Sequence, residues 1–330
     1  MADAMRVVVT GSIATDHLML FPGRFADQLM PDQLHRVSLS FLVDRLEVRR
    51  GGIAANICFG MAALGLRPVL VGAVGADFDD YRSWLERHGV DTASVHVSQL
   101  QHTARFLCTT DAEQNQIASF YAGAMSEARL IELAPIAARL GGLDLVVISP
   151  NDPDAMLQHT DECRERGYPF VADPSQQLAR MDGPQIRRLV EGAAFLFTND
   201  YEKVLTETKT GWSDAEVLAR VGVRVTTLGA KGAIVERAGE PAIRVEAVPE
   251  ITLADPTGVG DAFRAGFLAG LVWNVGLERC AQIGSLLATY VLETVGTQEY
   301  QVKQAAFHER FAKHFGETAA GEIDHMLDAH

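Results

Sequence analysis

Apolar runs and amphipathic segments alternate along most of the chain. Residues 6–11 form a short β-branched run that ends in glycine, which is typical of a buried strand in a parallel sheet. Between residues 128 and 198 the alternation becomes regular, with amphipathic segments at 128–140, 153–166 and 185–191 and apolar runs at 143–149, 168–173 and 193–198. This spacing predicts an α/β fold, in which right-handed crossovers build a central, mostly parallel sheet flanked by helices on both faces.

Two stretches break this rhythm with a period of two. Residues 34–49 and residues 103–121 each consist of two alternating apolar and polar segments joined by a polar turn. This pattern predicts two β-hairpins. We expect them to pair into a small β-sheet lid over the main sheet, formed by about residues 16–50 and 101–121.

The remaining elements complete a single α/β domain over residues 1–330. We expect strands at 68–75, 223–228, 233–236 and 242–248, and helices at 57–64, 79–89, 264–273, 277–292 and 305–327. The chain contains no internal repeat, low-complexity tract or interdomain linker.

Composition narrows the class of protein. With 330 residues, 48% of them hydrophobic, the chain can bury a large core. A formal net charge of −14 argues against a nucleic-acid or acidic-membrane partner. The four cysteines form no Cys-x-x-Cys pair and no apolar run approaches the length of a membrane span, so we expect reduced thiols in a cytoplasmic protein.

The most informative loop is Asp-Pro-Thr-Gly-Val-Gly-Asp at residues 255–261, directly before an apolar helical segment. Gly258 and Gly260 permit tight backbone geometry, and a helix N-terminus offers free N–H donors to phosphate oxygens. We expect the helix dipole to keep Asp261 ionised, so that it can accept a proton from an attacking hydroxyl. The motif therefore points to phosphoryl transfer, although an isolated match could be a loop with an acidic N-cap.

Other candidates follow predicted strands or open predicted helices. Asp16 comes just beyond the first strand, where α/β sheets bind ligands, and its alternative role is to cap a turn or helix. Gly51 and Gly52 precede a helix whose first turn carries Asn56.

A second group of candidates follows two later strands. Asn199 and Glu202 are three residues apart and could hold water around a magnesium ion, or form a capping box. The turn Gly229-Ala230-Lys231-Gly232 could bind a nucleotide phosphate or base edge, and it also suits an ordinary hairpin.

Taken in order, these motifs resemble the ribokinase-like carbohydrate kinase family from end to end. The match rests on Gly11 with Asp16, Gly51-Gly52 with Asn56, Asn199 to Glu202, Thr227 to Gly232, and Asp255 to Asp261. Within the family, the runs at residues 10–17 and 173–177 are most similar to bacterial-type adenosine kinases. The resemblance implies a ribokinase-like fold and transfer of the ATP γ-phosphoryl group to the 5′-hydroxyl of adenosine, giving AMP and ADP.

The resemblance also implies roles for individual residues. Asp261 would take the hydroxyl proton while Gly258, Val259 and Gly260 present amides to the phosphoryl group. Asp16, Gly52 and Asn56 would hold the ribose hydroxyls, with Gly51 beside them. The substrate residues at the base end would be Phe106 and Phe120, which could sandwich the purine, Gln176 and Gln177, which could read its edge, and Ser12 or Ser40, which could add a hydrogen bond. The residues implied for ATP are Asn199, Thr227, Gly229, Gly232, Gly258, Val259 and Gly260, and Glu202 would bind magnesium through water.

The loop departs from the commonest family signature at two positions. Pro256 replaces a threonine and Val259 an alanine. Because proline lacks a backbone N–H and a hydroxyl, it argues against a monovalent-cation site around Asp255, so we expect Mg²⁺ with ATP as the cofactor and leave the monovalent cation open.

Two alternatives to an adenosine kinase remain. The diol-binding set Asp16, Gly52 and Asn56 would suit another ribonucleoside, ribose or fructose equally well, whereas the pair Phe106 and Phe120 favours a purine. The second alternative is a non-catalytic nucleoside-binding protein, against which the intact Asp261 argues. The exposed edges of the lid sheet predict a homodimer formed through the lid.

Overall fold

A central sheet of eight strands organises the body of the protein. The computed structural model describes residues 5–28 and 39–324. In spatial order the strands are β14 (Ile243–Val245), β13 (Ala233–Glu236), β12 (Val223–Thr227), β11 (Phe195–Asn199), β10 (Phe170–Ala172), β9 (Leu145–Ile148), β1 (Val7–Thr10) and β4 (Val69–Val71). The strands from β4 to β12 are parallel, β13 pairs antiparallel with β12, and β14 pairs antiparallel with β13. The predicted mostly parallel sheet is confirmed.

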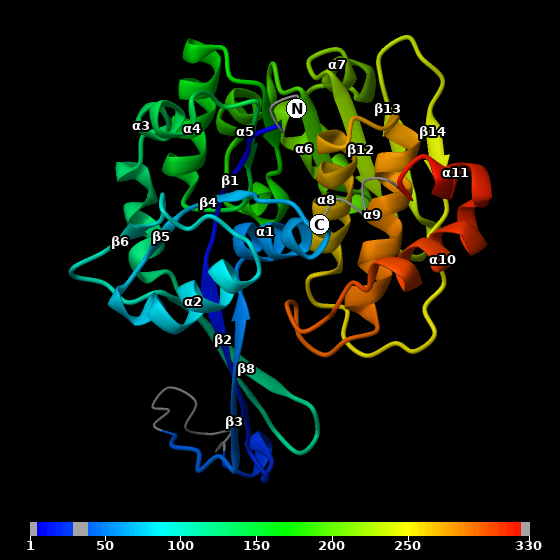
Figure 1. Cartoon of the computed structure of the whole chain (residues 1–330). Helices are drawn as coiled ribbons and strands as arrows, with labels where there is room; N and C mark the ends of the chain where they lie inside the picture. Colours follow the sequence, from blue (N-terminus) through cyan, green and yellow to red (C-terminus); the bar gives the residue numbers. More distant parts are fainter. Residues whose placement is uncertain (1–4, 29–38, 325–330) are drawn as a thin grey trace.

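Helices cover both faces of this sheet (Figure 1). One layer contains α1 (Ile53–Ala63), α2 (Asp79–Arg87), α8 (Val259–Val272), α9 (Leu277–Leu292), α10 (Gln304–Phe315) and α11 (Glu317–Gly321). The other contains α3 (Leu133–Leu140), α4 (Pro153–Arg166), α5 (Gly183–Val190), α6 (Asp200–Thr210) and α7 (Asp214–Leu218). Within the described residues, no helix combines the length and apolar character needed to span a membrane.

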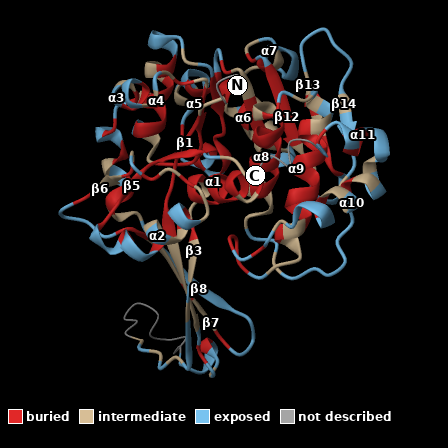
Figure 2. Ribbon diagram, viewed as in Figure 1, coloured by how far each residue is buried: buried red, intermediate tan, exposed pale blue. Residues whose placement is uncertain are grey.

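Successive side chains along each strand point to opposite faces of the sheet, which explains why helices pack on both faces. On β1, Val7 and Val9 pack into the core beneath α1 and α8, whereas Val8 packs into the core beneath α3 and α4. Figure 2 shows the result, a body buried throughout its interior from which the strands of a second sheet project.

The second sheet is the lid. Its strands lie in the order β3 (Arg45–Gly51), β2 (Ala14–Leu20), β7 (Ala104–Thr110) and β8 (Gln116–Tyr121). The hairpin predicted for residues 103–121 is confirmed as β7 and β8, and the two halves of the lid do join in one sheet.

The hairpin predicted for residues 34–49 is wrong. Residues 39–44 form no strand, residues 34–38 lie outside the described residues, and β3 pairs instead with β2. The sequence pattern hid β2 because Thr15, Asp16 and His17 interrupt its apolar positions. An edge-exposed sheet buries only part of each strand, so its strands need no apolar run.

Three other expected elements are divided. The strand expected at 68–75 is β4 followed by β5 (Ala73–Val74), which pairs with β6 (His96–Val97) in a separate two-stranded sheet. The helix expected at 128–140 is a 3₁₀ segment, Gly123–Leu130, followed by α3. The helix expected at 305–327 is α10 and α11, which Gly316 separates with a φ of 91° that continues no right-handed helix.

Candidate active site

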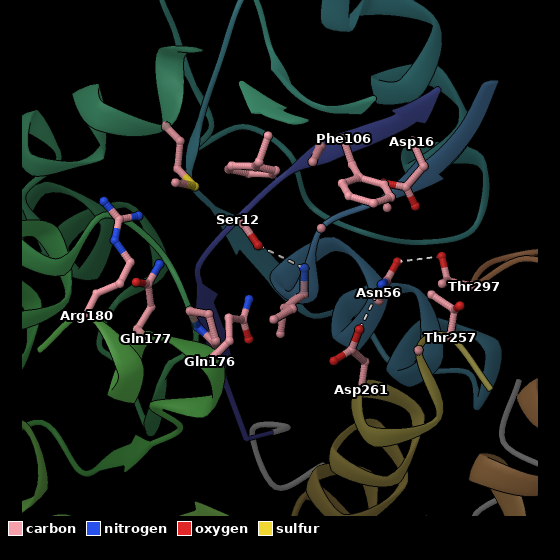
Figure 3. A pocket seen from close by; sticks show the side chains of 18 residues that line it. Ser12, Asp16, Asn56, Phe106, Gln176, Gln177, Arg180, Thr257, Asp261 and Thr297 are labelled. Carbon is pink, nitrogen blue, oxygen red and sulfur yellow. Dashed lines mark hydrogen bonds between the residues drawn. The ribbon is translucent and has the colours of Figure 1, made fainter. Parts of the chain in front are cut away.

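A cavity of about 390 Å³ lies between the lid and the carboxyl ends of the central strands. Side chains from β2, α1, β7, the loop after β10 and the start of α8 converge on it (Figure 3). Eleven of the predicted site residues line it: Ser12, Asp16, Gly51, Gly52, Asn56, Phe106, Phe120, Gln176, Gln177, Gly258 and Asp261. Segments far apart in the sequence therefore meet at one site.

The N-terminus of α8 forms the floor of this cavity. Gly258 is the N-cap with a φ of 79°, and no side chain caps this end of the helix. A Cβ at Gly258 would lie only 2.8 Å from Cγ2 of Thr297, so both the conformation and the close approach require glycine. The helix thus presents uncapped N–H groups and the positive end of its dipole to the cavity, which suits an anion.

Asp261 stands in the first turn of α8 and points into the cavity (Figure 3). Asn56 Nδ2 donates a hydrogen bond of 2.8 Å to its Oδ2. Burial raises the pKa of Asp261 to about 6, and Asn56 and Arg264 oppose that rise. The helix dipole was expected to keep this carboxylate ionised, but desolvation outweighs its favourable neighbours. A carboxylate with a pKa near 6 is a stronger base than an ordinary aspartate and is still mostly ionised at neutral pH.

The start of α1 is held against the segment that follows β1. A Cβ at Gly52, whose φ is 93°, would lie 2.6 Å from backbone atoms of residues 12–14. This close packing lets the Ser12 Oγ accept a 3.0 Å hydrogen bond from Ile53 N. Ser12 therefore caps α1 as well as lining the cavity.

A single row across the lid supplies the opposite wall. Backbone pairing places Arg49, Asp16, Phe106 and Phe120 side by side on β3, β2, β7 and β8. Directly paired residues project from the same face of a sheet, and Asp16, Phe106 and Phe120 line the cavity, with Arg49 beside Asp16 but outside the lining. Burial raises the pKa of Asp16 to about 6, and Arg49 opposes that rise.

The pairing of Phe106 with Phe120 does not favour the expected arrangement, in which the two rings would stack on opposite faces of a purine. Phe106 and Phe120 are cross-strand partners, and their rings rise from one face of one sheet. They form one wall of the cavity, so a flat ligand would stack against the lid from one side.

The loop after β10 bounds the far end of the cavity. Gln177 is buried, and its Nε2 donates to the carbonyl of Asn151 at 2.7 Å, whereas Gln176 is exposed. Arg180 also lines the cavity and lies beside these two amides in Figure 3. Sequence reasoning missed Arg180, Met125 and Thr297, because nothing in their local pattern distinguishes them from surface or core residues. Thr257 also lines the cavity, and it lies within the loop of residues 255–261, where the sequence assigned it no role.

Four of the residues expected to bind ATP, Asn199, Thr227, Gly229 and Gly232, lie at or just after neighbouring strand ends and do not line this cavity. Asn199 ends β11 directly beside Thr227, which ends β12, and the turn from Gly229 to Gly232 follows. Val259 and Gly260 form the first turn of α8. The strand order thus brings the predicted nucleotide residues to one edge of the sheet.

Asn199 and Glu202 form the capping box that was the alternative to a magnesium role. Asn199 Oδ1 accepts from Glu202 N at 2.7 Å, and Glu202 Oε2 accepts from Asn199 N at 2.8 Å. Burial raises the pKa of Glu202. Its second carboxylate oxygen has no part in the box, and nowhere among the described residues do three His, Cys, Asp or Glu gather as a metal-binding group. The oxygen of Glu202 that the box does not use has the chemistry that water around a magnesium ion needs, and the magnesium role of Glu202 stays a prediction.

A buried ion pair connects helix α8 to the loop after β10. Arg264 Nη2 donates to Asp173 Oδ1 at 2.6 Å and to Ser175 Oγ at 3.2 Å, and Arg264 Nη1 donates to the Gly260 carbonyl at 3.1 Å. Arg264 is 6% exposed and Asp173 is fully buried. Arg264 therefore fixes the first turn of α8 against the loop that carries Gln176 and Gln177, a role with no signal in the sequence.

Ser40 is the one predicted substrate residue that the structure does not bring near the cavity. It is exposed, lies in the segment without strand structure before β3, and is absent from the cavity lining. The expected hairpin would have placed it on the lid, and the missing first strand removes that placement.

The fold and the site define a class of protein, an α/β phosphotransferase with an uncapped helix N-terminus and a carboxylate beneath a β-sheet lid. Residues 9–304 match the pfkB family of carbohydrate kinases, and the chain belongs to that family.

Individual relatives narrow the comparison to nucleoside kinases. The nucleoside kinase of Methanothermobacter thermautotrophicus is 30% identical over 292 residues, which cover 86% of this chain and 92% of the relative. The nucleoside kinase of Burkholderia thailandensis, solved in complex with inosine, is 33% identical with a TM-score of 0.81 and covers 94% of this chain and 98% of that chain. The nucleoside kinase of Methanocaldococcus jannaschii is 25% identical with a TM-score of 0.80. The chain is similar to these enzymes over almost its whole length, which supports a nucleoside kinase of the ribokinase-like fold.

Proposed function

We propose that the protein is an adenosine kinase, which transfers the γ-phosphoryl group of ATP to the 5′-hydroxyl of adenosine to give AMP and ADP. The observation that carries this proposal is the position of Asp261, beside the uncapped end of α8 and opposite a lid row that combines a carboxylate with two aromatic rings. The nucleoside kinases similar to this chain support the same reaction class.

The geometry suggests a division of labour during the reaction. Asp16 would accept hydrogen bonds from the ribose diol, and the backbone at Gly52 and Ser12 would close around the sugar. Asp261 would accept the 5′-hydroxyl proton as the hydroxyl attacks, while the N–H groups at Gly258 and Gly260 stabilise charge on the transferred phosphoryl group. A loose transition state needs this alignment and charge stabilisation more than it needs a strong base.

The nucleotide would lie along the edge formed by the ends of β11 and β12. Asn199, Thr227, Gly229 and Gly232 would contact ATP, whose phosphates then point to the start of α8. A magnesium ion, when bound there, would supply positive charge that offsets the phosphate charge. Glu202 would hold its water. Arg49 Nη1 lies 3.4 Å from Asp255 Oδ2, so a cation already neutralises this carboxylate without a bound monovalent ion.

The Phe106 and Phe120 wall favours a purine over a free sugar, since a sugar has no flat π-system to stack on the aromatic rings. The inosine complex of the Burkholderia relative gives a specific reason to keep another purine nucleoside as the second candidate. Both nucleosides share the ribose and differ only at the purine edge, which Gln176, Gln177 and Arg180 would face in this proposal.

A substrate panel tests the proposal. Purified protein with Mg-ATP would be offered adenosine, inosine, guanosine, cytidine, ribose and fructose in an assay coupled to ADP release. We expect the highest kcat/KM with adenosine. A higher value with inosine would move the assignment to the second candidate, and turnover of sugars alone would refute both.

We also propose that the lid closes over the bound nucleoside and excludes water that would otherwise accept the phosphoryl group. The outer face of the lid carries the exposed Leu46, Val48 and Ile117. This face would pair with the lid of a second copy to form a homodimer. The use of ATP agrees with the cytoplasmic location expected from the sequence.

A further inference from the structure

A line of buried hydrogen bonds leads from the last residue of β3 to Asp261. The Tyr81 hydroxyl of α2 donates to the Gly51 carbonyl at 2.8 Å. Gln298 Nε2 donates to the Tyr81 hydroxyl oxygen at 2.6 Å and to Asn56 Oδ1 at 2.9 Å. Asn56 Nδ2 then donates to Asp261 Oδ2 at 2.8 Å, the bond drawn in Figure 3. Tyr81, Gln298 and Asn56 are 4%, 1% and 6% exposed, so water has little access to replace any partner.

The direction of each bond in this line follows from its first member. A backbone carbonyl can only accept, so the single hydroxyl hydrogen of Tyr81 points to Gly51. The Tyr81 oxygen must then accept, which turns the nitrogen of Gln298 toward it. The second N–H of that nitrogen requires an acceptor, so Asn56 presents its oxygen to Gln298 and its own N–H to Asp261.

Reversing the line would break several of these bonds. A reversed Gln298 amide would place its oxygen against Asn56 Oδ1 and lose both donated bonds. The present orientation is kept even though Gln298 Oε1 is buried without a partner. Thr297 Oγ1 lies 2.9 Å from Asn56 Oδ1 and 3.0 Å from the Arg50 carbonyl, and its single hydrogen can be donated to only one of them, so the orientation of Asn56 follows from Gln298.

We propose that Tyr81 and Gln298 are positioning residues for phosphoryl transfer, which orient the Asn56 amide so that Asp261 is held as a proton acceptor. This proposal rests on the proposed function, since it concerns the base of that reaction. An N–H directed at a carboxyl oxygen stabilises the ionised form, and an oxygen in the same place would stabilise the protonated form. The line also connects the base to Gly51, at the junction of lid and body.

The other charged groups around Asp261 determine in which direction its pKa moves when the Asn56 amide is no longer oriented. Arg264 on the same helix favours the ionised form, while Asp173, from the loop after β10, favours the protonated form. Asp261 lies close enough to the buried Tyr300 to raise the pKa of the Tyr300 hydroxyl. Glu202 raises the pKa of Arg264. If Asn56 is no longer oriented, burial and Asp173 remain, and the pKa of Asp261 rises above about 6.

Tyr81→Phe tests the proposal with minimal change in volume. Tyr300→Phe is the matched control, because it also removes a buried hydroxyl near Asp261 but takes no part in the line of bonds. The assay uses the nucleoside that the parent protein turns over best. For Tyr81→Phe we expect the acid limb of the kcat/KM profile to move up by about half to one pH unit. We also expect kcat near neutral pH to fall about 3- to 10-fold, with KM changed less than about 2-fold. Tyr300→Phe should leave the limb in place.

Gln298→Met provides a second, independent break in the line. Gln298→Met should shift the acid limb of the kcat/KM profile as Tyr81→Phe does. The double variant should show little further shift, because both substitutions break the same line of hydrogen bonds. Titration of the Asp261 carboxyl carbon by NMR, assigned with Asp261→Asn, gives the pKa without reference to any substrate. An unchanged Asp261 pKa in both Tyr81→Phe and Gln298→Met would overturn the proposal. A parent protein that phosphorylates no nucleoside would refute the proposed function, and the NMR titration would still decide the role of Tyr81 and Gln298.

Discussion

Two aspartates are the residues on which the site depends, and the structure raises the pKa of both. Asp16 lies on strand β2 of the lid and Asp261 on helix α8 of the body, yet burial raises the pKa of each carboxylate to about 6. Both remain mostly ionised at neutral pH, because Arg49 favours the ionised form of Asp16 and both Asn56 and Arg264 favour that of Asp261. Two basic carboxylates on opposite walls suit a hydroxyl-rich substrate that must lose one proton.

Asp261→Asn should lower kcat by about 10²- to 10⁴-fold while leaving nucleoside binding intact, because it removes the proton acceptor and keeps the size of the side chain. It should also stabilise the protein. The folded-state pKa of Asp261 lies above its ordinary value, so the folded state binds the proton more tightly and the parent gains stability as the pH falls through about 6.

At about pH 7.5 the variant should therefore be more stable than the parent by about 1–2 kcal/mol, and this difference should vanish near pH 4. Chemical unfolding at both pH values measures it. A variant that is less stable than the parent at pH 7.5, or a kcat that is unchanged, would contradict this account of Asp261.

Arg264→Met should destabilise the protein by about 3–5 kcal/mol, because it leaves Asp173 buried and without its cation. It should also raise KM, since the loop carrying Gln176 and Gln177 loses its connection to α8. Arg139→Met, which breaks the exposed pair with Asp91, is the control and should cost less than about 1 kcal/mol. Equal losses in the two variants would show that the buried pair has no special role.

At the scale of elements, the helices and strands of the body were predicted well from periodicity. The expected bounds of α4 and α9 coincide with the observed ones, since both helices bury a regular apolar stripe against the sheet. The lid was harder, because β2 is polar at three consecutive positions and pairs with a strand some thirty residues away and another some ninety away. Strand pairing over such separations leaves little trace in local pattern.

The same distinction explains what could be predicted of the site. Glycine loops before helices signal their role locally, so Gly52, Gly258 and Asp261 were found. Gln298 could not be found in this way: it is 242 residues from Asn56 and 217 from Tyr81, and only the packing of α1, α2 and the segment after α9 brings them together.

Phe106→Ala and Phe120→Ala test whether the β7–β8 hairpin provides a stacking surface. Loss of one ring should raise KM for a purine nucleoside between about 5- and 150-fold, corresponding to roughly 1–3 kcal/mol of stacking, and should change kcat little. Ile117→Ala, three positions from Phe120 and therefore on the other face of β8, is the control. Unchanged KM in both phenylalanine variants would favour a sugar substrate over a nucleoside.

At the scale of the whole molecule, the body and the lid differ in how far they bury their hydrophobic residues. The body buries two cores on either side of its sheet, and its interior is coloured as buried in Figure 2. The lid exposes large apolar side chains on β3 and β8. Leu46 and Val48 are 56% and 57% exposed. Adjacent exposed apolar residues on an edge strand are rare unless another surface covers them.

Val48→Glu should therefore convert the proposed homodimer to a monomer, because a charge would be buried in the apolar contact. Light scattering after size exclusion measures the mass. Val204→Glu, an exposed position on α6 in the body, is the control and should leave the mass unchanged. A parent protein that is monomeric at micromolar concentration would refute the homodimer.

The continuity of β1 and β2 has one further consequence. Only residues 11–13 separate a strand of the central sheet from the strand that carries Asp16, so the proposed closure of the lid would move Asp16, the proposed ribose contact, while Asp261 would stay with the body. If the lid closes as proposed, an empty enzyme would keep these two carboxylates apart and leave ATP without an aligned acceptor. Wasteful hydrolysis of ATP in the absence of a nucleoside would then be suppressed by the path of the chain itself.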